Sequence, residues 1–214
     1  MRLDHVSYVA SHDQISDVVN RIGSQIGTAF VDGGIHPKFG TRNFTAPLLN
    51  GQYIEIVCPL DHPATDTTPF GQAVKKKADA GGGWLAWVIS TDDMDSIEEL
   101  FARKSISAHR RKPDGEDLLW NQIGVSDLIE RPIRPFFIQW LAGVHPSSDG
   151  HANSSLVDIK INVQDEAEEE LLKLVLEKGE NSFSKQLNFI NSKHEEVGIV
   201  SVKFKSFDKE QEVF

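Results

Sequence analysis

The sequence lacks the features that define secreted and membrane proteins. Its single cysteine, Cys58, cannot form a disulfide within the chain. Its apolar runs are interrupted within about eight residues, far short of the roughly 20 residues that a membrane-spanning helix needs. Residues 1–10 have neither the apolar core nor the cleavage pattern of a signal peptide. These absences predict a soluble protein in the reducing cytoplasm.

Basic residues are also scarce. The chain has 22 Lys and Arg residues against 32 Asp and Glu residues, which gives a net charge of −10 at pH 7. A negative charge of this size opposes contact with the phosphates of nucleic acids and with anionic lipids. We therefore expect neither nucleic acid nor a membrane among the partners, and we expect a small-molecule substrate or ligand.

The length and composition are typical of a globular protein with a substantial core. The chain has 214 residues, of which 39% are hydrophobic and 25% are charged. A polar segment, 147–155, follows Pro146 and separates a long first part from a short second part. We therefore predict a main domain over residues 1–150 and a C-terminal extension over residues 151–214, packed on the main domain.

The main domain repeats the pattern of a strand followed by a helix. Residues 3–10 mix β-forming residues in near alternation, and the apolar spacing over 11–22 is helical. The same order returns in the strand-like segment 84–90 and the amphipathic segment 94–103. Short strands after each helix complete two βαβββ modules, although a chance similarity of two strand–helix units stays an alternative.

Aligning the modules identifies positions that correspond. The segment that starts the first module, 3–11, aligns with 83–91, and the segment that ends it, 52–57, aligns with 136–141. The second alignment places Glu55 in correspondence with Gln139, and Tyr53 in correspondence with Phe137. Glu55 lies between two isoleucines, and a carboxylate in the middle of an apolar strand needs a polar partner.

The C-terminal extension is predicted to be a partial third unit of the βαββ type. Strand-like segments at 156–163, 187–192 and 197–204 surround a helical pattern over 165–178. We expect the last ten residues, 205–214, to fray, as chain ends often do.

Three segments carry a resemblance to a known group of proteins: HPKFGTRNFTAPLLNGQYIEIVCP (36–59), RRKPDGEDLLW (110–120) and RPFFIQWLAGVHP (134–146). With paired βαβββ modules, a His on the first strand and a Glu on the fourth, the chain resembles glyoxalase-like proteins of the vicinal oxygen chelate superfamily. This superfamily includes glyoxalase I, extradiol dioxygenases and antibiotic-resistance proteins. The resemblance covers about residues 3–180 and implies an α+β fold, in which a cupped mixed sheet has its helices outside.

The resemblance implies four metal-ligand positions, on the inner faces of the first and fourth strands of each module. His5, Glu55 and Gln139 occupy three of them, and Leu85 occupies the fourth and offers no donor. One divalent metal, such as Zn, Fe, Mn or Ni, is expected if a cofactor is present. A metal-free polar pocket and a simple structural pair of His5 with Glu55 remain the alternatives.

The same segments suggest residues that contact the substrate. His36, Arg42 and Asn43 are candidate polar contacts, since Asn offers a donor and an acceptor and Arg offers a planar fork. Four aromatic residues are expected to line the cup, namely Tyr53, Trp87, Trp120 and Phe137. A turn over residues 40–43 explains the polar residues there equally well, and core packing explains the aromatic residues. The basic cluster 110–112 either faces an anionic ligand at the rim or is a solvated surface.

These residues lead to two functional hypotheses. The first is a small-molecule enzyme of the lyase, isomerase or dioxygenase type that acts on vicinal oxygens, with Glu55 as the base or a metal ligand. The second is a metal-free protein that binds or sequesters a small molecule, as resistance proteins of this superfamily do, and the absence of a donor at Leu85 favours it. We expect a monomer or a homodimer.

Overall fold

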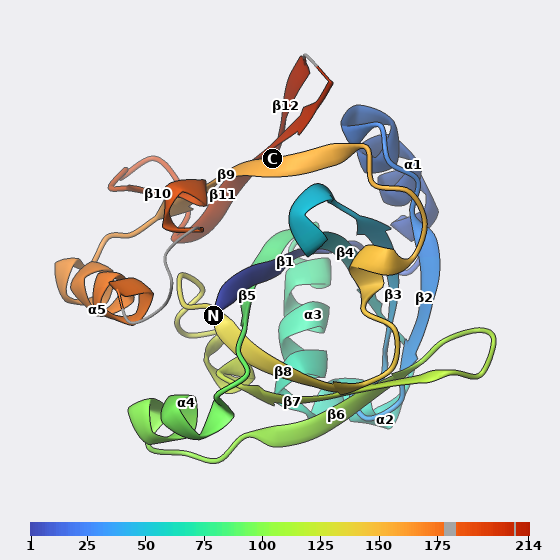
Figure 1. The fold of residues 1–214 in the computed structure, drawn as a ribbon, viewed down its shortest axis with the longest axis horizontal. Helices are drawn as coiled ribbons and strands as arrows, with labels where there is room; N and C mark the ends of the chain where they lie inside the picture. The colour runs from blue at the N-terminus through green and yellow to red at the C-terminus, as the bar shows by residue number, and fades with distance from the viewer. Residues whose placement is uncertain (178–182, 208) are drawn as a thin grey trace.

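The computed structural model describes residues 1–177, 183–207 and 209–214. A closed barrel of eight strands, in the order β1-β4-β3-β2-β6-β7-β8-β5, forms the main part, and a separate four-stranded sheet lies outside it (Figure 1). Helices pack against both parts. This α+β architecture confirms the predicted fold class. No helix among the described residues is long and apolar enough to cross a membrane.

The first half of the barrel is one βαβββ module, composed of β1 (Arg2–Val9), α1 (Ile15–Ile26), β2 (Val31–His36), β3 (Thr41–Pro47) and β4 (Tyr53–Pro59). Helix α1 buries Ile15, Ile22 and Ile26, which its periodicity places on one face. It ends at Gly27, whose φ of 66° is the left-handed conformation that glycine adopts without strain.

The second half repeats the module with β5 (Gly83–Ser90), α4 (Met94–Phe101), β6 (Ile106–Arg111), β7 (Asp117–Ile123) and β8 (Phe136–Ala142). Asp93 caps α4, since its side chain accepts a hydrogen bond from the backbone N–H of Ser96 at 3.1 Å. Two helices, α2 (Pro63–Thr67) and α3 (Pro69–Asp79), connect the modules.

Strand pairing gives the correspondence between the two modules directly. In the parallel pair β1 and β4, His5 lies opposite Tyr53 and Ser7 lies opposite Glu55. The parallel pair β5 and β8 has the same register, with these opposed pairs: Val88 with Phe136, and Ser90 with Ile138. Strand β1 also pairs with β5, where His5 lies opposite Val88, so the two modules meet at their first strands. The repeat is present, but the two predicted alignments cannot both hold. The shared register requires one offset between the modules, whereas the alignments of His5 with Leu85 and of Glu55 with Gln139 use two.

Two hydrophobic cores occupy the two sides of the barrel wall. Helix α3 packs against the inner face and lies within the ring of strands in Figure 1, with Phe70 and Val74 in the inner core. The outer core joins the outward side chains of the barrel to α1, α4 and the C-terminal sheet. Because α3 fills part of the barrel, only a small internal space remains for a ligand.

The C-terminal unit consists of β9 (Ser154–Asn162), α5 (Glu166–Glu177), β10 (Leu187–Ile190), β11 (Gly198–Ser206) and β12 (Lys209–Val213). Its strand order is β10-β9-β11-β12, so its first strand lies in the middle, whereas in each module the first strand pairs with the fourth. The predicted helix extends to residue 178, which lies outside the described residues. The expected fraying of the last ten residues is wrong, because β12 pairs with β11 and the carbonyl of Val213 accepts a hydrogen bond from Trp84 Nε1 at 2.9 Å.

Candidate functional site

A small cavity lies inside the barrel, between the inner faces of both modules. The volume open to the centre of a water molecule is about 30 Å³. This is room for about two waters. Six polar residues line it: His5, His36, Asn43, Glu55, Arg110 and Gln122. Six aromatic residues surround them: Phe39, Tyr53, Phe70, Trp120, Phe136 and Trp140. Polar groups that converge within an aromatic lining are a feature of small-molecule sites.

Glu55 is the carboxylate at the centre of the first module. Only 5% of it is exposed, and its two oxygens accept hydrogen bonds from Ser7 Oγ and Asn43 Nδ2, each at 2.7 Å. Burial raises the pKa of Glu55, but the nearby His36 and His5 and the two hydrogen bonds outweigh burial, so the pKa lies below its usual value. Glu55 is therefore ionised at neutral pH.

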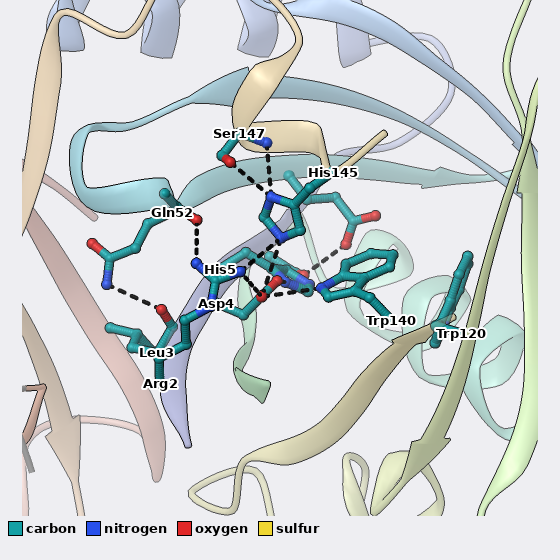
Figure 2. Close-up of polar contacts among 12 residues, drawn as sticks. Arg2, Leu3, Asp4, His5, Gln52, Trp120, Trp140, His145 and Ser147 are labelled. Carbon is teal, nitrogen blue, oxygen red and sulfur yellow. Dashed lines mark hydrogen bonds and ion pairs between the residues drawn. The ribbon is translucent and has the colours of Figure 1, made fainter. Parts of the chain in front are cut away.

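His5 is held by a buried aspartate beside it in the sequence. His5 Nδ1 lies 2.9 Å from Asp4 Oδ1, and Asp4 also accepts hydrogen bonds from Trp140 Nε1 at 3.1 Å and His145 Nε2 at 3.2 Å (Figure 2). Burial raises the pKa of Asp4, but these histidines outweigh burial and hold the pKa well below its usual range. The ionised Asp4 keeps a proton on His5 Nδ1, so Nε2 is the free acceptor of the ring.

An irregularity in β1 explains how Asp4 and His5 reach each other. Neighbouring residues of a regular strand point to opposite faces. The pairing of β1 with β5 shifts register between Leu3 and His5, which is the local distortion that a β-bulge produces. The His5 ring then stacks on Tyr53, with centroids 4.3 Å apart. Sequence reasoning missed Asp4, because alternation assigns it to the other face.

His36 is the second histidine of the cavity and is uncharged. Its Nδ1 lies 3.0 Å from Thr41 Oγ1, and its Nε2 lies 4.0 Å from Glu55 Oε1. Burial lowers the pKa of His36 to about 4, although the charge of Glu55 acts in the opposite direction. At neutral pH the ring is therefore an uncharged polar group beside Glu55, and its centroid lies 5.8 Å from that of Trp120.

The second module contributes hydrogen-bond donors. Gln122 Oε1 accepts a hydrogen bond from Trp120 Nε1 at 2.7 Å, which fixes the amide and leaves Gln122 Nε2 without an acceptor among the described residues. Arg110 Nε and Nη2 likewise have no hydrogen-bond partner in the described part of the chain. Alternate residues of a strand point to the same face, which places both Arg110 and Gln122 on the inner face. This alternation was the signal in the sequence that could have identified them.

Six of the residues predicted from the sequence are brought together at this cavity: His5, His36, Asn43, Tyr53, Glu55 and Trp120. Two other predicted residues lie elsewhere. Arg42 forms an ion pair with Asp32 on the outer side of β3. Trp87 is fully buried in the outer core, where its Nε1 donates to the carbonyl of Ile133 at 2.9 Å.

The structure also does not bring Phe137 and Gln139 to the cavity. Strand β8 presents Phe136, Ile138 and Trp140 to it. Phe137 lies in the outer core, and Gln139 Nε2 donates to the carbonyl of Asp92 at 2.9 Å. The physical reason is the alignment error of one position, because a shift of one position in a strand moves every side chain to the opposite face.

The donors present do not fit a resident divalent metal ion. Strand β8 presents Phe136, Ile138 and Trp140 to the cavity, and none of them is a metal ligand. Val88, which lies opposite His5, and Leu85 offer no donor either. Within residues 1–177, 183–207 and 209–214, no group of three His, Cys, Asp or Glu side chains is arranged to hold a metal. A divalent ion prefers three or more good donors.

Comparisons with known proteins agree with this architecture. The model of a family described as Glyoxalase-like domain matches residues 3–175. A search of the curated proteins finds no significant match to the sequence.

Among solved structures, a hypothetical protein from Staphylococcus aureus is similar, with a TM-score of 0.59 and 15% identity over 98% of this chain and 83% of that chain. Methylmalonyl-CoA epimerase from Mycobacterium tuberculosis has a TM-score of 0.45 and 16% identity, over 66% of this chain and 88% of that one. A variant of Streptomyces coelicolor methylmalonyl-CoA epimerase, in complex with 2-nitronate-propionyl-CoA, has a TM-score of 0.43 and 14% identity, over 67% and 99%. At such low identity, the first likeness shows a shared fold alone.

Proposed function

Because this chain belongs to the glyoxalase-like domain family, within the vicinal oxygen chelate superfamily, we propose that it is a small-molecule enzyme that transfers a proton at a carbon next to a carbonyl group. The observation that carries the proposal is the ionised Glu55 in an aromatic cavity, with His5 oriented by Asp4. An isomerase or lyase reaction fits this site. A dioxygenase reaction does not, because it needs a redox metal and the donors do not fit one.

The proposed step transfers a proton without an oxidant or reductant. Glu55 accepts a proton from the substrate carbon, the carbon–hydrogen bond breaks, and its electron pair moves to the carbonyl oxygen to form an enolate. The Nε2 donors of Gln122 stabilise the negative oxygen. In a substrate with vicinal oxygens, His5 Nε2 takes up the hydroxyl proton and passes it to the negative oxygen, while Glu55 returns its proton to the neighbouring carbon, so both side chains end in their starting states.

The size of the cavity limits the reacting part of the substrate. About 30 Å³ accommodates a group of a few heavy atoms. Trp140 and His145, whose ring centroids lie 5.1 Å apart, both hydrogen-bond to Asp4 beside His5 (Figure 2). We therefore propose a small hydroxy-carbonyl or keto compound.

Deuterium incorporation from D2O tests the proposal. Dihydroxyacetone and pyruvate are incubated with the protein, and exchange at carbon is followed by NMR. We expect wild-type protein to accelerate exchange of at least one probe and Glu55→Gln to reduce that rate by about 100-fold or more. Glu130→Gln, at an exposed position outside the cavity, is the matched control and keeps the rate. An equal exchange rate in wild type and Glu55→Gln contradicts the proposal.

A second candidate is a metal-free protein that binds or sequesters a small molecule without turnover. Both oxygens of Glu55 are already hydrogen-bonded and its pKa is lowered, which makes Glu55 a weaker base. The same experiment distinguishes the candidates, since a binding protein shows saturable ligand binding and no deuterium incorporation.

We also propose a cytoplasmic location and a monomer or homodimer. The free thiol of Cys58 supports a reducing compartment, and burial raises its pKa to about 11, so the thiol stays protonated and unreactive. Light scattering of the purified protein determines the oligomeric state.

A further inference from the structure

Arg110 is a buried cation without hydrogen bonds. It lies on β6 with only 2% of its side chain exposed, and neither Nε nor Nη2 has a hydrogen-bond partner among the described residues. A buried guanidinium whose donors are unmatched is unfavourable, because its lost hydration is not replaced. Its donors are therefore left for a ligand in the cavity that Arg110 lines.

Among the described residues, Arg110 has only a long ion pair with a carboxylate, Asp149, and no hydrogen bond to it. Asp149 Oδ2 lies 3.7 Å from Arg110 Nη2, which is beyond hydrogen-bond length, while Asp149 Oδ1 accepts a hydrogen bond from Lys112 Nζ at 2.9 Å. Asp149 is therefore shared with a second cation. Glu55, the carboxylate of the first module, is hydrogen-bonded to Ser7 and Asn43 instead.

The surroundings of Arg110 select a small planar anion. Gln122 Nε2 adds further unmatched donors, and Leu118 and Trp120 supply apolar walls of the same cavity. The two donors of a guanidinium edge match the two oxygens of a carboxylate. A tetrahedral phosphate group is bulkier than a planar carboxylate group. It therefore fits less well into a cavity of about 30 Å³.

The chain also leaves room for Arg110 at Gly33. A Cβ atom at this position would lie 2.8 Å from Arg110 Nη1 and 2.2 Å from Asn43 Oδ1, both closer than real Cβ contacts. Any side chain at Gly33 therefore displaces the guanidinium or the amide from the cavity.

We infer that Arg110 binds the carboxylate group of the substrate, which makes the substrate a small hydroxy acid or keto acid. The inference rests on the proposed function for the reacting end of the molecule, at Glu55, and adds the recognised end. The first module then transfers the proton, while the second module binds the charge.

Binding of pyruvate and its neutral analogue methyl pyruvate tests the inference. Trp120 and Trp140 line the cavity, so their fluorescence reports binding directly. We expect wild-type protein to bind pyruvate more tightly than methyl pyruvate. Arg110→Met should lower the affinity for pyruvate by about tenfold or more and leave the affinity for methyl pyruvate unchanged. Formate, acetate and lactate extend the series, and phosphate serves as the competing tetrahedral anion.

Two further variants separate binding from folding. Arg111→Met removes the neighbouring arginine, whose side chain is 61% exposed and paired with Asp117, and should leave pyruvate binding within about twofold. Gly33→Ala keeps the charge but crowds both Arg110 and Asn43, and it should weaken the binding of pyruvate. Circular dichroism confirms that each variant is folded.

Several outcomes overturn the inference: equal affinity for pyruvate and methyl pyruvate, an unchanged affinity in Arg110→Met, tighter binding of phosphate than of any carboxylate, or no saturable signal with any carboxylate. The proposed function fails separately. If Glu55→Gln keeps the deuterium exchange while pyruvate binding still depends on Arg110, the proton-transfer proposal is contradicted and the carboxylate site stands.

Discussion

The two modules of the barrel share a backbone and differ in chemistry. Ser7 lies opposite Glu55 in the first module, and Ser90 lies opposite Ile138 at the same register in the second. The first module thus places an ionised carboxylate where the second places an apolar side chain. The difference shows that a repeated fold does not repeat its site, since the second module contributes Arg110 and other donors to the same cavity.

The largest expected effect tests the placement of Trp87. Trp87 was expected to line the cup of the second module, but it is buried in the outer core and does not line the cavity. We expect Trp87→Ala to lower the free energy of unfolding by about 4 kcal/mol, the typical loss for a large aromatic in a core. Urea denaturation measures this loss. Pyruvate affinity should stay unchanged in the folded variant, and a large loss of affinity with little loss of stability contradicts the placement.

His36 gives the second effect, a pH dependence of stability that belongs to the first module. Its folded pKa of about 4 lies below the usual value of 6.5, so the unfolded chain binds more protons between these values. The contribution of His36 to the free energy of unfolding is therefore fully present above about pH 6.5. It falls by about 3 kcal/mol as the pH falls to 4.

The matched variants are His36→Gln and His151→Gln, the latter at an exposed position. Urea denaturation at several pH values should show a flatter profile for His36→Gln and an unchanged profile for His151→Gln. Equal slopes for all three proteins contradict the buried, neutral state of His36.

Two serines, one in the first strand of each module, provide a direct comparison of the modules. Ser7→Ala removes a 2.7 Å hydrogen bond from the buried carboxylate of Glu55 and should cost about 2 kcal/mol of stability. Ser90→Ala removes a hydroxyl opposite an apolar residue and should change stability by less than about 0.5 kcal/mol. Similar losses of stability in both variants would contradict the proposed electrostatic difference between the modules.

The smallest effect has the opposite sign. Without a ligand, Arg110→Met replaces a buried guanidinium that lacks hydrogen bonds with an apolar side chain, and we expect stability to rise by about 1 kcal/mol. Thermal denaturation of the two proteins measures the change. A clear loss of stability in Arg110→Met would instead indicate that Asp149 already compensates the charge.

Much of the fold was predictable because periodicity is a local property. Alternation identified the strands, and the strand–helix order identified two modules. The exact alignment of the modules was not predictable, because the number of residues in a turn is not visible in an apolar pattern, and one position decided whether Gln139 or its neighbours face the cavity.

The candidate site was predictable where one strand or motif carried it. His5 and Glu55 share the cavity as expected, and so do His36 and Asn43. The partners of these residues were not predictable. Ser7 and Glu55 lie on different strands, far apart in the sequence, and the bond between Asp4 and His5 depends on an irregularity in β1 that no local pattern shows.

The central claim is that Glu55 transfers a proton without a resident metal ion. Deuterium incorporation by protein dialysed against EDTA, compared with undialysed protein and with protein supplied with Zn, Fe, Mn or Ni, tests it most directly. We expect the same rate in every sample. A rate that is lost on dialysis and restored by one of these ions would contradict the claim.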